Sequence, residues 1–192
     1  MKKIIVFVVT VIWMIAGYSQ NKISFTTNDY VLALKHATDV MVNDVASPVA
    51  ASRYYAYINL AANETAALFN KQQPHFAGIL KGLNNIIVDE NLIKKSDQQL
   101  AVILALYKSA IRFLPSGYLL HKNPDSLKLV AKKRKLPVEK INATVELVDK
   151  VVEQVFKFAY ADGFVRLSGF RRFTPTTGDE YWLWPENDII YY

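Results

Sequence analysis

The feature that most constrains this chain is the spacing of its apolar residues, which recur every three or four positions between Pro and Gly residues. The clearest example follows Pro137, where apolar side chains recur in this way from Ile141 to Ala159. Such spacing places apolar side chains on one face of an α-helix. No segment keeps the two-residue alternation of a strand for long, and no fixed-period repeat occurs. The sequence therefore predicts an all-α fold, a helical bundle.

Capping residues and helix breakers divide residues 20–163, the predicted bundle region, into separate helices. The helix starts predicted from N-cap residues or from Pro in the first turn are Thr26, Ser47-Pro48, Ser96, Asn123-Pro124 and Pro137. Ser96 has capping-box spacing with Gln99. In the first helix we expect Met41 and Val45 to share the buried face. The second, rich in Ala and Tyr nearly all round, is expected to be a central, mostly buried helix.

Residues 1–19 have the pattern of a secretory signal peptide. Lys2 and Lys3 precede an apolar run, and Gly17 and Ser19 are small residues at the positions needed for cleavage after Ser19. The run is shorter than the roughly 20 apolar residues of a membrane span, so we expect no stable membrane anchor. Retention as an anchor is the alternative. The prediction is an exported protein, periplasmic or secreted.

Composition excludes several kinds of site. The chain has no cysteine, which excludes disulfides, thiolate zinc sites, iron–sulfur clusters and a cysteine nucleophile. Its three histidines, His36, His75 and His121, are too few and too scattered to predict a metal site. No glycine-rich loop that could cradle a phosphate is present. The residues themselves thus predict neither a metal nor a cofactor.

Glu64 lies within the Ala-rich helix that follows Pro48. Burying a carboxylate is costly unless it is paired, so we expect Glu64 to cap or bond to a neighbouring helix. A role as catalytic base is the alternative. Arg53, on the same helix, is eleven residues away and could pair with Glu64 only by folding back.

The net charge of +6 is concentrated in one segment. Residues 122–140 carry seven Lys and Arg against two Asp and Glu, and two further lysines belong to the signal peptide. Because this segment has no aromatic residue that could stack on bases, we expect no nucleic-acid partner. Basic residues near a helix end complement the helix dipole. The alternative is weak contact with an anionic surface through Lys132, Lys133, Arg134 and Lys135.

Two stretches resemble the vanadium-dependent haloperoxidase and type 2 phosphatidic acid phosphatase superfamily. The first begins at Asp39 and is similar to the Ser-Pro … Ser-Arg-x-Tyr-Ala-Tyr … Glu helix of exported members. The second begins at Arg171 and is similar to the Thr-Pro-Thr-x-Gly-x-x-Tyr-Trp loop before the first active-site motif. The family-like structural residues in the two stretches are Ser47, Pro48, Arg53, Tyr57, Glu64, Thr174, Pro175, Thr177 and Gly178.

The resemblance implies a helical-bundle enzyme that binds a tetrahedral oxyanion, phosphate in the phosphatases and vanadate in the haloperoxidases. The family site needs an Arg-Pro motif, a Ser-Gly-His turn and an Arg six residues before a His. Here no Arg-Pro dipeptide exists, the two Ser-Gly pairs are followed by Tyr118 and Phe170, and no His has such an Arg. No catalytic residue is therefore carried over, and vanadate is expected only if a C-terminal half is also present.

We accordingly expect the N-terminal portion of an exported haloperoxidase- or phosphatase-like protein, with an incomplete bundle that is inactive by itself. A C-terminal half or a partner chain would then cover its apolar faces. In the aromatic, Pro-rich region 164–192, the candidates for the mouth of a completed site are Arg171, Arg172, Tyr181 and Trp182, with loop anchoring as the alternative. A different possible class is a complete, non-enzymatic helical binding module of the cell envelope.

Overall fold

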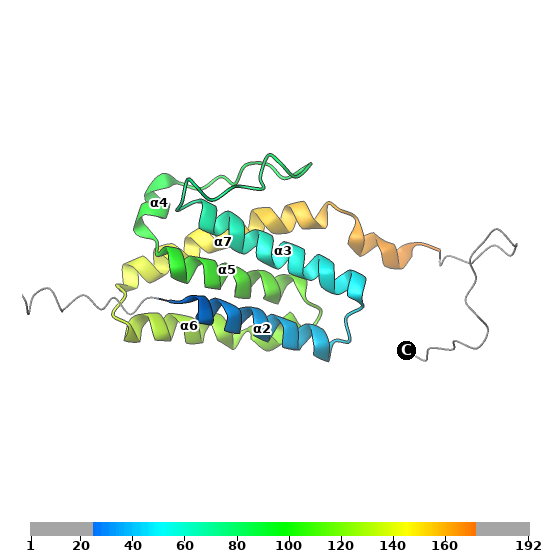
Figure 1. The fold of residues 1–192 in the computed structure, drawn as a ribbon, viewed down its shortest axis with the longest axis horizontal. Coiled ribbons are helices and arrows are strands. Elements are labelled where there is room, and N and C mark those ends of the chain that lie inside the picture. The colour runs from blue at the N-terminus through cyan, green and yellow to red at the C-terminus, as the bar shows by residue number, and fades with distance from the viewer. Residues whose placement is uncertain (1–24, 172–192) are drawn as a thin grey trace, which may run out of the picture. The chain divides into compact units, whose positions relative to one another are not determined.

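The structure, a computed structural model, describes residues 25–171 and confirms the predicted all-α fold. Within these residues six α-helices and two short 3-10 helices follow one another, and no strand occurs (Figure 1). The elements, in chain order, are α2 (Thr27–Asn43), α3 (Pro48–Ala67), α4 (Glu90–Lys95), α5 (Gln98–Phe113), η1 (Gly117–Leu120), α6 (Lys122–Lys133), α7 (Val138–Tyr160) and η2 (Phe164–Gly169).

The five long helices form an antiparallel bundle. Consecutive long helices run in opposite directions, so α2, α5 and α7 begin at the end of the bundle where α3 and α6 finish (Figure 1). The segment between α3 and α5, which includes α4, makes a long excursion along α3. Short connections between antiparallel neighbours are the usual arrangement of helical bundles.

The central helix is α5, whereas the sequence favoured α3. Nine of the sixteen residues of α5 are buried: Leu100, Ala101, Ile103, Leu104, Ala105, Leu106, Tyr107, Ser109 and Ala110. On α3, by contrast, Ser52 and Ala56 are exposed and form part of an open face. The helix α3 is therefore apolar nearly all round because it has a second apolar face that is open, and not because it lies at the centre of the bundle.

Helix caps explain where most helices begin. The Ser47 hydroxyl accepts the N–H of Ala50 at 3.4 Å and Pro48 occupies the first turn of α3, as predicted. The prediction of Ser96 as an N-cap was wrong, because Ser96 ends α4, a short helix that the sequence pattern did not indicate. The N-cap of α5 is Asp97, whose carboxylate accepts the N–H of Leu100 at 3.0 Å.

Val45 does not belong to the core. The expectation that it shares the buried face with Met41 was wrong, because α2 ends at Asn43 and Val45 lies in the following turn, 84% exposed. Its φ of 49° is unfavourable for a β-branched residue. The turn is held by Asp44, whose carboxylate accepts the N–H of Ser116 at 3.0 Å.

The chain divides between Ala159 and Tyr160 into two compact units. The first holds the bundle, and the second, within residues 160–171, holds η2, where Gly163 adopts a φ of 80° and Asp162 accepts the N–H of Phe164 at 2.8 Å. No helix in the described range 25–171 combines the length and hydropathy needed to cross a bilayer. The predicted signal peptide, residues 1–19, lies outside the described residues.

Replacing a central leucine tests this packing. Leu104 is fully buried on α5, whereas Leu129 on α6 is 58% exposed. We expect Leu104→Ala to lower the free energy of unfolding by about 2–5 kcal/mol through lost burial and a residual cavity. Leu129→Ala, the matched control, should change it by about 0.5 kcal/mol or less. Urea unfolding of both variants measures the difference, and equal losses would contradict a core centred on α5.

Candidate functional site

The family-like residues of the first stretch lie along α3, and each holds this helix in place. Arg53 donates through Nη2 to the carbonyl oxygen of Ala159 at 3.1 Å, near the end of α7. Its guanidinium also lies 4.9 Å from the centre of the Tyr57 ring. Because the last carbonyls of a helix have no partner within it, Arg53 satisfies one of them and fixes the end of α7 to α3.

Tyr57 begins an aromatic cluster that joins α3, α5 and α7. Its ring stacks on Phe113 at 5.5 Å between centroids and meets Phe158 edge-on at 6.0 Å. Phe113 in turn contacts Phe156 at 5.6 Å, and the Arg112 guanidinium lies 3.9 Å from the Phe156 ring centre. Such ring pairs add to the stability that area burial supplies. Tyr57 is thus a packing residue shared by three helices.

Glu64 is a fully buried carboxylate, and a loop rather than a neighbouring helix supplies its partners. Its Oε1 accepts the N–H of Phe76 at 2.6 Å and that of Ala77 at 3.4 Å, and the Nδ1–H of His75 donates to Oε2 at 2.8 Å. Three donors compensate for the loss of water around the carboxylate. Bonding, as expected from the sequence, is therefore the role that the geometry gives Glu64.

Asn63 reinforces the same connection. Its Nδ2 donates to the carbonyl oxygen of Pro74 at 3.1 Å, and its Oδ1 accepts Nε2 of Gln73 at 2.7 Å. Two consecutive residues near the end of α3 therefore hold residues 73–77 against the helix. Sequence reasoning missed this role of Asn63, since a contact eleven residues away leaves no periodic signal.

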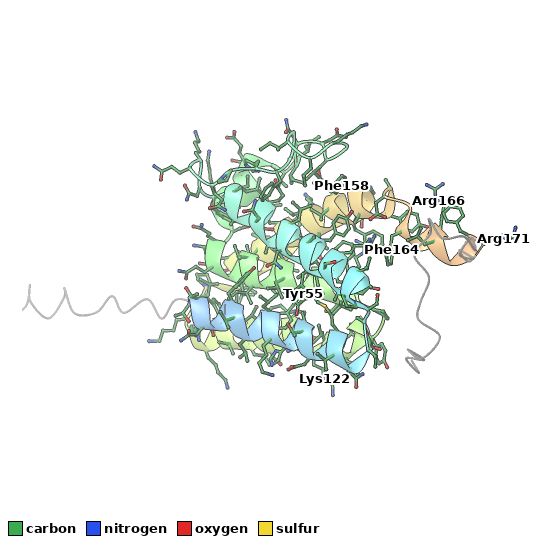
Figure 2. The ribbon with its side chains drawn as sticks, turned by 45° about the vertical axis from the view of Figure 1, so that its right-hand side comes forward. Tyr55, Lys122, Phe158, Phe164, Arg166 and Arg171 are labelled. Carbon is green, nitrogen blue, oxygen red and sulfur yellow. The ribbon has the colours of Figure 1, made fainter. Side chains whose placement is uncertain are left out.

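A groove of about 750 Å³ opens beside α3. Side chains from five segments line it, among them Tyr30, Ala56, Leu60, Phe76, Val102 and Phe158. None of the described residues lining it is charged, and its polar side chains are the amides of Asn59, Asn63 and Gln73 and the phenols of Tyr30 and Tyr57. Figure 2 shows Phe158 on the last turns of α7, beside α3, and Tyr55 between α3 and α2.

The Tyr30 phenol belongs to the polar part of the groove. It donates to Oδ1 of Asn59 at 2.7 Å, and Nδ2 of Asn59 donates to the carbonyl oxygen of Tyr55 at 2.8 Å. Burial raises the pKa of the Tyr30 phenol, so the group stays protonated and neutral at physiological pH. Tyr55 itself contacts α2, with its phenol oxygen 2.7 Å from Thr38 Oγ1. The groove is therefore an apolar surface with a few neutral hydrogen-bonding groups.

The described residues do not form an oxyanion site of the kind that vanadate needs. Such a site gathers several Arg or Lys donors and a histidine around one anion. Here Arg53 and Arg112 pack on aromatic rings, and no charged residue among the described ones faces the groove. Within residues 25–171, no three His, Cys, Asp or Glu side chains are grouped so as to hold a metal ion.

The three histidines occupy separate places in the fold. His36 Nδ1 lies 2.8 Å from the phenol oxygen of Tyr107 and 3.2 Å from Nδ2 of Asn123. These contacts join α2, α5 and α6. His75 pairs with Glu64, and His121 is exposed at the start of α6. The structure therefore does not bring them together.

The second family-like stretch is almost wholly outside the described residues. Arg171, exposed in the second unit, is described. The others, Arg172, Thr174, Pro175, Thr177, Gly178, Tyr181 and Trp182, are not.

The basic segment divides into two groups. Lys132, Lys133 and Lys135 are exposed, whereas the Arg134 guanidinium lies 4.5 Å from the Phe25 ring centre and 3.5 Å from the Asp29 carboxylate.

Comparison with known proteins links this chain to a solved structure. No family model and no curated protein matches the chain. A bacterial vanadium-dependent iodoperoxidase matches it with a TM-score of 0.72 and 25% identity over 78% of this chain. The chain spans 35% of the length of that protein. This likeness supports the superfamily resemblance of the sequence stretches, and the helical unit has a haloperoxidase-like fold.

Removing the charge of Glu64 tests the connection between α3 and the loop. Glu64→Gln keeps the shape of the side chain but replaces one acceptor oxygen by an NH2 group. This donor then faces the donors of residues 75–77. We expect the free energy of unfolding to fall by about 1–3 kcal/mol. Glu146, exposed on α7 and paired with Lys150, offers the matched control. Glu146→Gln should cost about 0.5 kcal/mol or less, and equal effects in urea unfolding would refute the bonding role.

Proposed function

We propose that this chain supplies the helical scaffold of an exported haloperoxidase-like protein, and that its described residues support the reaction site rather than perform the reaction. The observation that carries the proposal is the uncharged groove of about 750 Å³ beside α3, in a unit similar to a vanadium-dependent iodoperoxidase. An apolar face of this kind is typical of a surface that packs against further protein. In this proposal, further helices of the fold occupy the groove.

The oxyanion chemistry would come from residues other than those in 25–171. The sequence has no Arg-Pro dipeptide and no Ser-Gly-His turn, and Arg53 and Arg112 beside the groove pack on aromatic rings. The chain by itself is therefore proposed to be inactive. Arg171, Arg172, Tyr181 and Trp182 remain candidates for the mouth of a completed site.

The proposal also includes export of the protein and weak contact with anionic surfaces. The signal-peptide pattern of residues 1–19 supports export to the periplasm or the medium. Lys132, Lys133 and Lys135 are exposed and could contact an anionic surface weakly, whereas Arg134 is held against Phe25.

The alternative is a complete, non-enzymatic helical binding module. One observation favours it: residues 25–155 share one continuous hydrophobic core, as expected of a self-sufficient domain. A module of this kind would be monodisperse, would melt cooperatively and would bind little apolar dye. A scaffold awaiting further helices would bind such dye in its groove.

Dye binding and peroxidase assays on the full chain distinguish these functions. We expect the neutral dye Nile red to bind, and Ala56→Glu, an exposed position lining the groove, to reduce binding without lowering Tm. Val42→Glu, at an apolar site that is 72% exposed and does not line the groove, should leave dye binding unchanged. Equal effects of the two variants, or no dye binding, would contradict an open packing face.

The same protein should not oxidise iodide. With vanadate and hydrogen peroxide added, triiodide formation should not exceed that caused by vanadate in buffer. Iodide oxidation that saturates with vanadate would show that the chain carries a complete site and would overturn the scaffold proposal.

A further inference from the structure

Figure 1 shows the end of the bundle where α2, α5 and α7 begin and α3 and α6 finish. A second cavity lies at this end. It measures about 590 Å³, within the size range of small-molecule sites. Its wall is formed by residues at the starts of α5 and α7 and at the ends of α3 and α6, together with Phe25, which lies just before α2. This cavity is separate from the groove beside α3 and shares no lining residue with it.

Cationic residues outnumber anionic ones in this cavity. Arg134, Lys135 and Lys140 line it, and Asp97 is the one carboxylate among the described residues of its wall. Asp97 is engaged as the N-cap of α5, with Oδ1 accepting the N–H of Leu100, while Oδ2 lies 3.8 Å from Lys140 Nζ. The wall therefore has an excess of positive charge that an anion would complement.

A further carboxylate, beside Arg134, is also used locally. Asp29, which lies 3.5 Å from Arg134, accepts the backbone N–H of Thr26 at 2.8 Å and the Thr26 hydroxyl at 3.1 Å. Burial acts to raise the pKa of Asp29, but the Thr26 hydrogen bonds and the Arg134 charge act against it, and the net pKa is lowered. Asp29 is thus a charged residue of the α2 capping box that pairs with Arg134.

Lys135 occupies a backbone position that favours glycine. Its φ is 62°, in the turn that ends α6, where Leu136 N–H donates to Ala131 O at 3.0 Å and Lys135 N–H to Lys132 O at 2.9 Å. Glycine is usual at this place in such a helix end because a side chain is strained there. A lysine in place of glycine thus adds a cation to the cavity wall at a cost in backbone conformation.

The remainder of the cavity wall combines apolar side chains with the polar Ser96, Gln98 and Gln99. Phe69, Leu136 and Pro137 line it beside the cations, and the Arg134 guanidinium lies 4.5 Å from the Phe25 ring centre. A wall with cations on one part and apolar side chains on another matches a molecule with an anionic head and an apolar body.

We propose that this cavity binds a small organic acid, a carboxylate attached to an aromatic or alkyl body. The carboxylate would be bound by Lys135, Lys140 and Arg134, and the body would lie against Phe69, Leu136 and Pro137. This site is independent of the proposed scaffold function, because it involves neither the groove nor the second unit.

Calorimetry on the full chain tests this site with 4-phenylbutyrate as probe. We expect saturable binding of the acid, and binding about tenfold weaker for the neutral analogue 4-phenylbutanol, because the alcohol lacks the charge-assisted contacts. Inorganic phosphate, an anion without an apolar body, should also bind more weakly than the acid. Equal affinity of acid and alcohol, tighter binding of phosphate, or no binding of the acid would overturn the proposal.

Two variants locate the binding. Lys135→Gly removes one cation and relieves the backbone, so Tm should not fall while the affinity for 4-phenylbutyrate drops about tenfold. Lys133→Ala removes an exposed cation of the same segment that does not line the cavity, and it should leave the affinity unchanged. Equal losses in both variants would indicate diffuse attraction to the basic segment and would refute a built site.

Discussion

The exposed side of α3 depends on one constraint, the need of the Glu64 carboxylate for donors once it is removed from water. The N–H groups of Phe76 and Ala77 and the ring of His75 meet this need. To reach Glu64, the chain must return over the end of α3 after leaving it, and this return places the Phe76 side chain in the wall of the groove. A buried charge thus determines where an apolar surface forms.

In the first stretch that resembles the haloperoxidase superfamily, the residues have structural roles in the fold rather than roles in a reaction. Ser47 begins α3, Arg53 fixes the end of α7, Tyr57 joins three helices and Glu64 holds the following loop. Each role concerns the position of α3. A likeness to a vanadium-dependent iodoperoxidase at 25% identity over 78% of this chain is in keeping with residues of that kind.

Local signals in the sequence predicted the local features of the fold, and contacts distant in sequence account for the rest. Thr26 and Ser47 begin helices as predicted, because capping involves residues only three positions apart. Periodicity cannot tell a central helix from one with two apolar faces, so α3 was favoured over α5. At the site, a bonded Glu64 was predicted from the cost of burying a charge, but its loop partners were not. Pairs such as Tyr30 with Asn59 leave no signal in the sequence.

The dependence of the groove on Glu64 can be measured most directly by amide hydrogen exchange at Phe76 in the full chain. We expect this N–H to be strongly protected, and we expect Glu64→Gln to remove the protection while amides of central α5, such as Leu104, remain protected. Such a result would show that the carboxylate holds the loop as a wall of the groove. A Phe76 amide that exchanges as fast in the unaltered protein as in Glu64→Gln would contradict the account.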